Sequence, residues 1–80
     1  MAKESNIVHR YFKKKLEDCT ILVRVNPIAL KGLEITIVPQ GEAQIRELNF
    51  DDNIWEDLAA DAFEESGALE FNLYYAGLAS

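Results

Sequence analysis

Few residues in this chain of 80 could support covalent or acid–base chemistry. His9 is the only histidine and Cys19 is the only cysteine. A thiol and an imidazole can act as a nucleophile and its base, and ten residues separate them, so a contact is geometrically possible. A lone cysteine at an apolar strand position usually behaves as a small core hydrophobe. The sequence therefore favours a structural role for Cys19, with a ligand or catalytic groove near His9 and Cys19 as the alternative.

The common catalytic and cofactor-binding motifs are absent from the sequence. The four glycines are scattered, so there is no phosphate-binding loop and no dinucleotide fingerprint. A structural zinc site needs about four cysteine or histidine ligands, and the chain has one of each. We therefore predict no catalytic residue, no metal site and no cofactor, and the sequence favours a non-enzymatic protein.

A group of carboxylates stands out in the second half of the chain. Asp57, Asp61 and Glu64 have the i, i+4, i+7 spacing of one helix face. Such a face is most commonly just solvated, but residues 51–70 contain no cation that would relieve the repulsion. The functional hypothesis is that these three residues bind a basic partner. A site for a hard cation such as Mg²⁺ is the least favoured alternative.

Cations gather instead in the first part of the chain. Residues 1–32 carry seven cations against three anions, whereas residues 33–80 carry one cation against eleven anions. Cations with aromatic neighbours are typical of nucleic-acid surfaces, but the net charge of −6 argues against binding along DNA or RNA. Charge compensation within the fold is the alternative. The candidate basic patch consists of Arg10, Lys13, Lys14 and Lys15.

Two helices follow from the hydrophobic periodicity. Residues 5–17 are predicted to be helical because Val8, Phe12 and Leu16 recur at every fourth position. Residues 53–66 have apolar side chains at i, i+3, i+4, i+7 and i+8, which is the pattern of one buried helix face.

Four strands follow from alternation of apolar and polar residues. The third strand changes parity part-way, which predicts a β-bulge near Arg46 and Glu47. A hairpin turn is predicted at residues 39–42, where Gly41 can adopt a positive φ. The predicted strands cover residues 19–25, 33–38, 43–50 and 68–76.

The resulting order, α-β-β-β-α-β, predicts a single α+β domain over residues 1–80. Two helices would pack on one face of a four-stranded, mostly antiparallel sheet, with the last strand parallel to its neighbour. The other face would then be open to solvent, with Leu22 and Tyr74 as a modest apolar patch for a partner or for self-association.

The sequence also suggests a location and a class of function. No apolar stretch approaches the roughly 20 residues of a membrane span, and a secretory signal is absent, so we expect a soluble, cytoplasmic protein. The best hypothesis is a small protein-interaction module that uses Asp57, Asp61, Glu64, Tyr74 or a sheet edge. A small-ligand binder or enzyme near His9 and Cys19 is the first alternative. Nucleic-acid association through the basic patch is the second.

Overall fold

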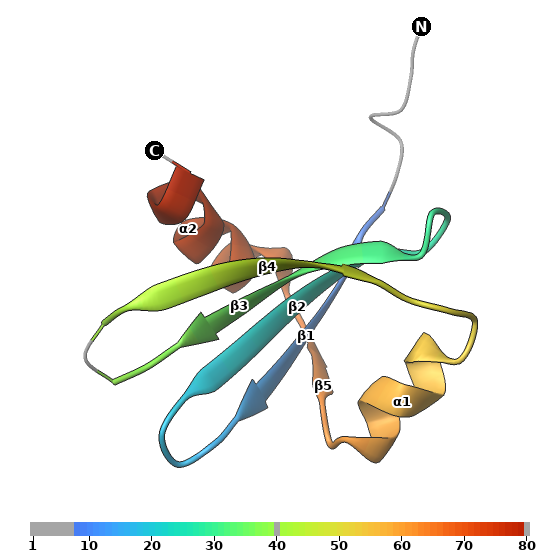
Figure 1. The fold of residues 1–80 in the computed structure, drawn as a ribbon, viewed down its shortest axis with the longest axis horizontal. Helices are drawn as coiled ribbons and strands as arrows, with labels where there is room; N and C mark the ends of the chain where they lie inside the picture. Colours follow the sequence, from blue (N-terminus) through green and yellow to red (C-terminus); the bar gives the residue numbers. More distant parts are fainter. Residues whose placement is uncertain (1–7, 40, 80) are drawn as a thin grey trace, which may run out of the picture.

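The computed structural model describes residues 8–39 and 41–79, which form one antiparallel sheet and two helices (Figure 1). The sheet order is β4-β3-β2-β1-β5. The α+β class and the antiparallel character of the sheet are therefore confirmed, but the sheet has five strands instead of four. The elements are β1 (Arg10–Lys15), β2 (Thr20–Asn26), β3 (Lys31–Ile37), β4 (Ala43–Asn49), α1 (Ile54–Ala60), β5 (Glu64–Ser66) and α2 (Ala68–Ala79).

The first predicted helix, residues 5–17, is wrong over residues 10–15, which form β1 between β2 and β5. A spacing of four is also a multiple of two, so it fits one face of a strand as well as one face of a helix. Phe12 is buried on that face, whereas Val8 is 78% exposed. The predicted residues 5–7 lie outside the described residues.

The last predicted strand, residues 68–76, is wrong because these residues belong to α2. Apolar residues occupy most positions of this segment, so both a two-residue and a 3.6-residue period can be drawn through it. In the structure Phe71 is 2% exposed and Tyr75 is half-buried, while Leu69 and Leu73 are exposed. This helix therefore packs on the sheet through Phe71 and Tyr75, and its other apolar side, with Leu69 and Leu73, faces solvent.

The second predicted helix, residues 53–66, begins as expected but ends at Ala60. The amide of Phe63 donates to the carbonyl of Leu58 and the amide of Ala62 donates to the carbonyl of Ala59. This pair of hydrogen bonds is a Schellman motif, with Ala62 at the left-handed position, φ 66°. The chain then enters β5, which pairs antiparallel with β1 and not parallel as the predicted crossover required.

The two helices lie against opposite faces of the sheet, whereas both were predicted on one face. Val23 and Val25 of β2 join α1 in one apolar cluster, and Leu22 of the same strand joins Phe71 of α2 in another. Neighbouring residues of a strand point to opposite faces, so both faces of β2 are buried. The register of β4 against β3 is continuous from Ala43 to Asn49. The predicted bulge is therefore wrong. The apolar residues of β4 change parity because Ile45 lies on one face of the sheet and Leu48 lies on the other.

The remaining strand and turn predictions agree closely with the structure. Strands were predicted over 19–25, 33–38 and 43–50, and β2, β3 and β4 begin and end within two residues of those ranges. The β3–β4 turn closes with a hydrogen bond from the Val38 amide to the Glu42 carbonyl, and Gly41 has a φ of 95°. Local turn chemistry and alternation were thus sufficient to predict the hairpins.

Replacing Ala62 by glycine should stabilise the fold. A left-handed alanine costs about 1–2 kcal/mol, and the greater freedom of glycine in the unfolded chain offsets part of this. We expect Ala62→Gly to raise the free energy of unfolding by about 0.5–1 kcal/mol in urea denaturation. Ala60→Gly, within α1, is the matched control and should lower it by a similar amount. A loss of stability in Ala62→Gly would contradict the helix end described above.

Replacing Gly32 by alanine should destabilise the fold. An added Cβ would clash with the carbonyl oxygen of Arg24 and would lie 2.6 Å from Cε2 of Phe50. We expect Gly32→Ala to lower the free energy of unfolding by about 1–3 kcal/mol. Gly67→Ala is the control, because a Cβ there meets open space. Equal stability of the two variants would refute this close approach.

Candidate functional site

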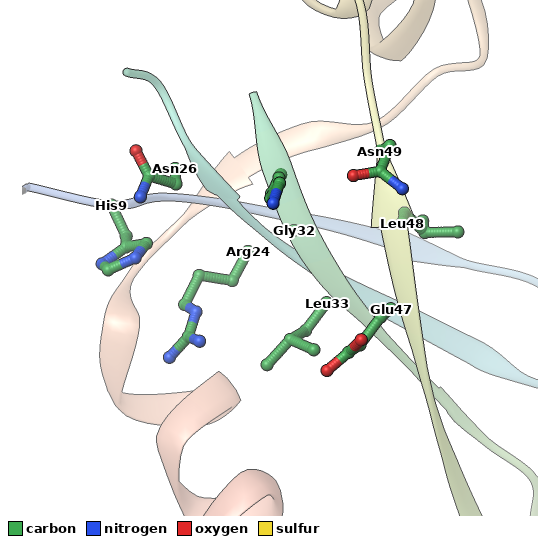
Figure 2. A pocket seen from close by; sticks show the side chains of 9 residues that line it. His9, Arg24, Asn26, Gly32, Leu33, Glu47, Leu48 and Asn49 are labelled. Carbon is green, nitrogen blue, oxygen red and sulfur yellow. The ribbon is translucent and has the colours of Figure 1, made fainter. Parts of the chain in front are cut away.

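A polar pocket of about 440 Å³ lies across the sheet where β1 begins (Figure 2). It draws residues from β2, β3 and β4 and from the segment just before β1. Its lining combines an imidazole, a guanidinium and an ammonium group, from His9, Arg24 and Lys31. Its lining residues are His9, Arg24, Asn26, Lys31, Gly32, Leu33, Glu47, Leu48 and Asn49.

Strand register places seven of the nine residues in two rows on the face that α2 covers, while Gly32 and Leu48 have the opposite parity. The inner row is Arg24, Leu33 and Glu47, which are paired across three strands. The outer row is Asn26, Lys31 and Asn49, and His9 extends it because Arg10 pairs with Val25. Paired residues share a face of the sheet. The pocket is therefore built on rigid strands, beyond the part of this face where Phe71 packs on Leu22 and Ile35.

Arg24 is the central cation of the pocket. Its guanidinium carbon lies 5.5 Å from the ring centroid of Phe71 and 5.2 Å from that of Tyr75, so cation–π contacts hold it against α2. The side chain is half-buried. Within the described residues, no carboxylate lies within ion-pair distance of it. Arg24 lines the pocket, and its N–H donors have no acceptor among the residues that the structure describes.

His9 lies beside this cation and responds to it. Burial lowers the pKa of His9 below its ordinary value of 6.5, and the positive charge of Arg24 lowers it further. Both effects disfavour the charged imidazolium. The imidazole is therefore neutral at pH 7, with one nitrogen able to donate a hydrogen bond and the other able to accept one.

Asn26 contributes an oriented amide. Its Oδ1 accepts hydrogen bonds from the backbone amides of Ile28 and Ala29, at 2.9 and 3.1 Å. This turn ends with Leu30 at a φ of 56°. Since the amide oxygen is engaged by the turn, the amide nitrogen is the group that Asn26 can offer to a ligand.

The three carboxylates predicted to form one helix face are separated by the structure. Asp57 lies on α1, Asp61 follows its last turn, and Glu64 belongs to β5. All three are exposed. Glu64 is paired with Lys13 in the β5–β1 register and lines a pocket together with three lysines. The single acidic helix face is therefore wrong, because the helix ends before it can include the third residue.

The predicted open sheet face is also wrong. Leu22 is 1% exposed beneath α2. Tyr74 lies on α2 itself and is partly exposed. Both faces of β2 are therefore covered, and Leu69, Leu73 and Tyr74 of α2 are exposed instead of Leu22.

The predicted basic patch is divided between the two faces of the sheet because it lies on a strand. Arg10 and Lys14 point to the α1 face, and Lys13 and Lys15 point to the α2 face. Two of these four residues are engaged in ion pairs, and the hydrogen bonds from Arg10 lower the pKa of Glu65. Lys13 pairs with Glu70 at 3.1 Å. Arg10 is therefore separated from Lys13 and Lys15 by the sheet, while Lys13, Lys14 and Lys15 line one pocket together with Glu64.

Cys19 is neither in a core cluster nor near His9. It lies half-buried in the β1–β2 turn. His9 is at the opposite end of β1, whose six residues span about 20 Å. The structure thus separates the candidate nucleophile–base pair and keeps only the His9 part of the predicted groove.

Sequence analysis missed Arg24 as a site residue. A signal was present, because Arg24 is the one charged residue in the apolar segment 20–25. Arg24 has the same parity as Leu22, which the predicted arrangement placed on the solvent-exposed face. The aromatic residues that hold it come from a segment that was predicted to be a strand.

Removing the charge of Arg24 should raise the pKa of His9. In Arg24→Gln the electrostatic contribution disappears and the burial contribution remains, so the pKa should move toward 6.5 without reaching it. An NMR pH titration of the imidazole measures this directly, since the chain has one histidine. Arg46→Gln is the control, because Arg46 pairs with Glu34 on the opposite face. An unchanged pKa in Arg24→Gln would contradict the proximity of the two groups.

Neither a metal-binding cluster in the described residues nor a similarity to known proteins was found for this chain. Within residues 8–39 and 41–79 no cluster of three or more His, Cys, Asp or Glu side chains could hold a metal ion. In the same residues, neither helix has the length and apolar character needed to cross a membrane. Searches of protein-family models, curated proteins and solved structures found no match to this chain.

Proposed function

We propose that this chain is a small protein-interaction module that binds through the outer face of α2, and that its partner there is a second copy of the chain. The observation that carries the proposal is the exposure of two leucines on a helix whose apolar residues are not confined to the side that meets the sheet: Leu69 is 72% exposed and Leu73 is 66% exposed. A helix of this kind is normally buried on every side.

The outer face is defined by helical spacing. Leu69, Leu73 and Ala76 recur at i, i+4 and i+7 and form one stripe. Phe71 and Tyr75 point to the sheet on the other side. We refer to the stripe Leu69, Leu73 and Ala76 as the outer stripe of α2.

Charge supports a second copy as the partner. Two molecules that each carry a net charge of −6 repel one another, so a self-contact is favoured only where the facing surfaces are uncharged. The only charged residue of α2 is Glu70, and it is paired with Lys13. The outer stripe therefore brings no charge into such an interface.

The shape of the stripe supports the same partner. A two-fold interface places the same patch of both molecules in contact. In an antiparallel pair of α2 helices, Leu73 faces Leu73 of the other copy, and Leu69 faces the small Ala76. Twelve residues of helix span only about 18 Å, so the interface is smaller than the standard ~800 Å² per partner. We expect a weak dimer, with a dissociation constant of the order of 100 μM.

A cysteine cross-link tests the two-fold arrangement. In a Cys19→Ser background, Leu73→Cys places thiols of the two copies opposite each other, so mild oxidation should yield a disulfide-linked dimer. Ile28→Cys in the same background is the control, because Ile28 is 77% exposed in the β2–β3 turn and lies away from α2. It should cross-link only at the slow rate of random collisions.

Sedimentation equilibrium gives an independent measurement on the native chain. We expect the average mass to rise with concentration, and Leu69→Gln with Leu73→Gln should keep the protein monomeric without loss of the fold, because both side chains are exposed. A monomer at all concentrations, together with equal cross-linking at residues 28 and 73, would overturn the proposal.

A further inference from the structure

We propose that the pocket at the start of β1 binds a small oxyanion, a carboxylate or a phosphate, with Arg24 as its anchor. The inference rests on the geometry of the pocket alone and is independent of the α2 interface. It concerns a ligand-binding site on the chain and not a reaction.

Arg24 is the group in the pocket that is best suited to bind an anion. A guanidinium presents its donors in a planar fork that matches two oxygens of a carboxylate or phosphate. Phe71 and Tyr75 of α2 hold this group through cation–π contacts. The donors at its edges have no acceptor within the described residues. A pre-positioned, half-buried cation without a counter-ion is a binding group for an anion.

Other hydrogen-bond donors line the pocket together with Arg24. Lys31 adds an ammonium group, the amide nitrogen of Asn26 is the free end of that side chain, and neutral His9 can donate from one ring nitrogen. Asn49 closes the outer row of the pocket. Figure 2 shows His9, Asn26 and Asn49 around the pocket, drawn from the segment before β1 and from strands β2 and β4.

Glu47 limits the site on the β4 side. It lies two strands from Arg24, so their Cα atoms are about 10 Å apart. Its carboxylate repels an anion, which therefore binds at the His9–Arg24 end of the pocket. A volume of about 440 Å³ is ample for a small anionic group and its waters.

Anion binding and protonation of His9 must be coupled. A bound anion offsets the positive charge of Arg24, so it raises the pKa of His9 relative to the free protein. By linkage, the anion binds more tightly as the pH falls through the interval between the two pKa values. The other charged groups that line the pocket are Lys31 on β3 and Glu47 on β4, Tyr75 of α2 lies against Arg24, and Glu70 is engaged by Lys13.

The experiment is an NMR titration of the native chain with sodium sulfate, sodium phosphate and sodium acetate at constant ionic strength. The one imidazole in the chain is the reporter. We expect a saturable shift with a dissociation constant of the order of 1 mM. Sulfate serves for the pH series because its charge is constant there. Comparison of phosphate with acetate distinguishes a phosphate site from a carboxylate site.

Variants with opposite expected signs make the test specific. Arg24→Gln should weaken binding about tenfold or more, and Lys31→Gln should weaken it about two- to threefold. Glu47→Gln should strengthen it about twofold, because it removes a repulsive charge. Lys31 and Glu47 are exposed, so Lys31→Gln and Glu47→Gln should fold normally and keep the test valid even where Arg24→Gln fails to fold. Arg46→Gln, on the opposite face, is the control and should leave the affinity unchanged.

Two results would overturn the inference. One is a His9 signal that does not shift with any of the three anions well above the millimolar range. The other is a shift that is linear in anion concentration and is the same in Arg46→Gln, Lys31→Gln and Glu47→Gln, which is the behaviour of weak, non-specific anion association.

Discussion

The arrangement of the molecule depends on one constraint, the burial of strand β2 from both sides. Leu22, Val23 and Val25 are each at most 3% exposed, and Leu22 points to the opposite face from the two valines. Apolar side chains on both faces of a sheet require cover on both faces. The part of the chain that the structure describes has two short helices for this purpose. One helix is therefore used on each face, and the sheet lies between them.

The cations of β1 join this sheet to the segments that cover it. Arg10 donates to Glu65 and lies 4.6 Å from the ring centroid of Trp55, while Lys13 pairs with Glu70. These contacts link the basic first part of the chain to its acidic second part. Exposed ion pairs contribute little to stability because water and salt screen them. Their main effect is to fix which segments meet, because a carboxylate from β5 or α2 is favoured beside a strand rich in cations.

The sequence predicted the three hairpin strands well and the terminal elements poorly. Strands β2, β3 and β4 are joined by short turns, and the signals for them are local. The assignments of residues 5–17 and 68–76 failed because their periodicity fits a helix and a strand equally well, and the choice is made by contacts with distant segments. Arg24 illustrates the same limit for the site. Phe71 and Tyr75 form its environment. These two residues belong to α2, which was predicted to be a strand because its apolar residues alternate.

The pairing of β5 with β1 has a consequence for how the chain folds. Arg10 and Glu65, which this pairing brings together, are 55 residues apart in sequence, whereas β1 to β4 are joined by short turns. Closing the long loop costs more chain entropy than closing a hairpin. We therefore infer that the four-stranded meander forms first and that β5 closes on it last. Until then one edge of β1 is unpaired, and Lys13, Lys14 and Lys15 give that edge the charge that keeps exposed strands from aggregating.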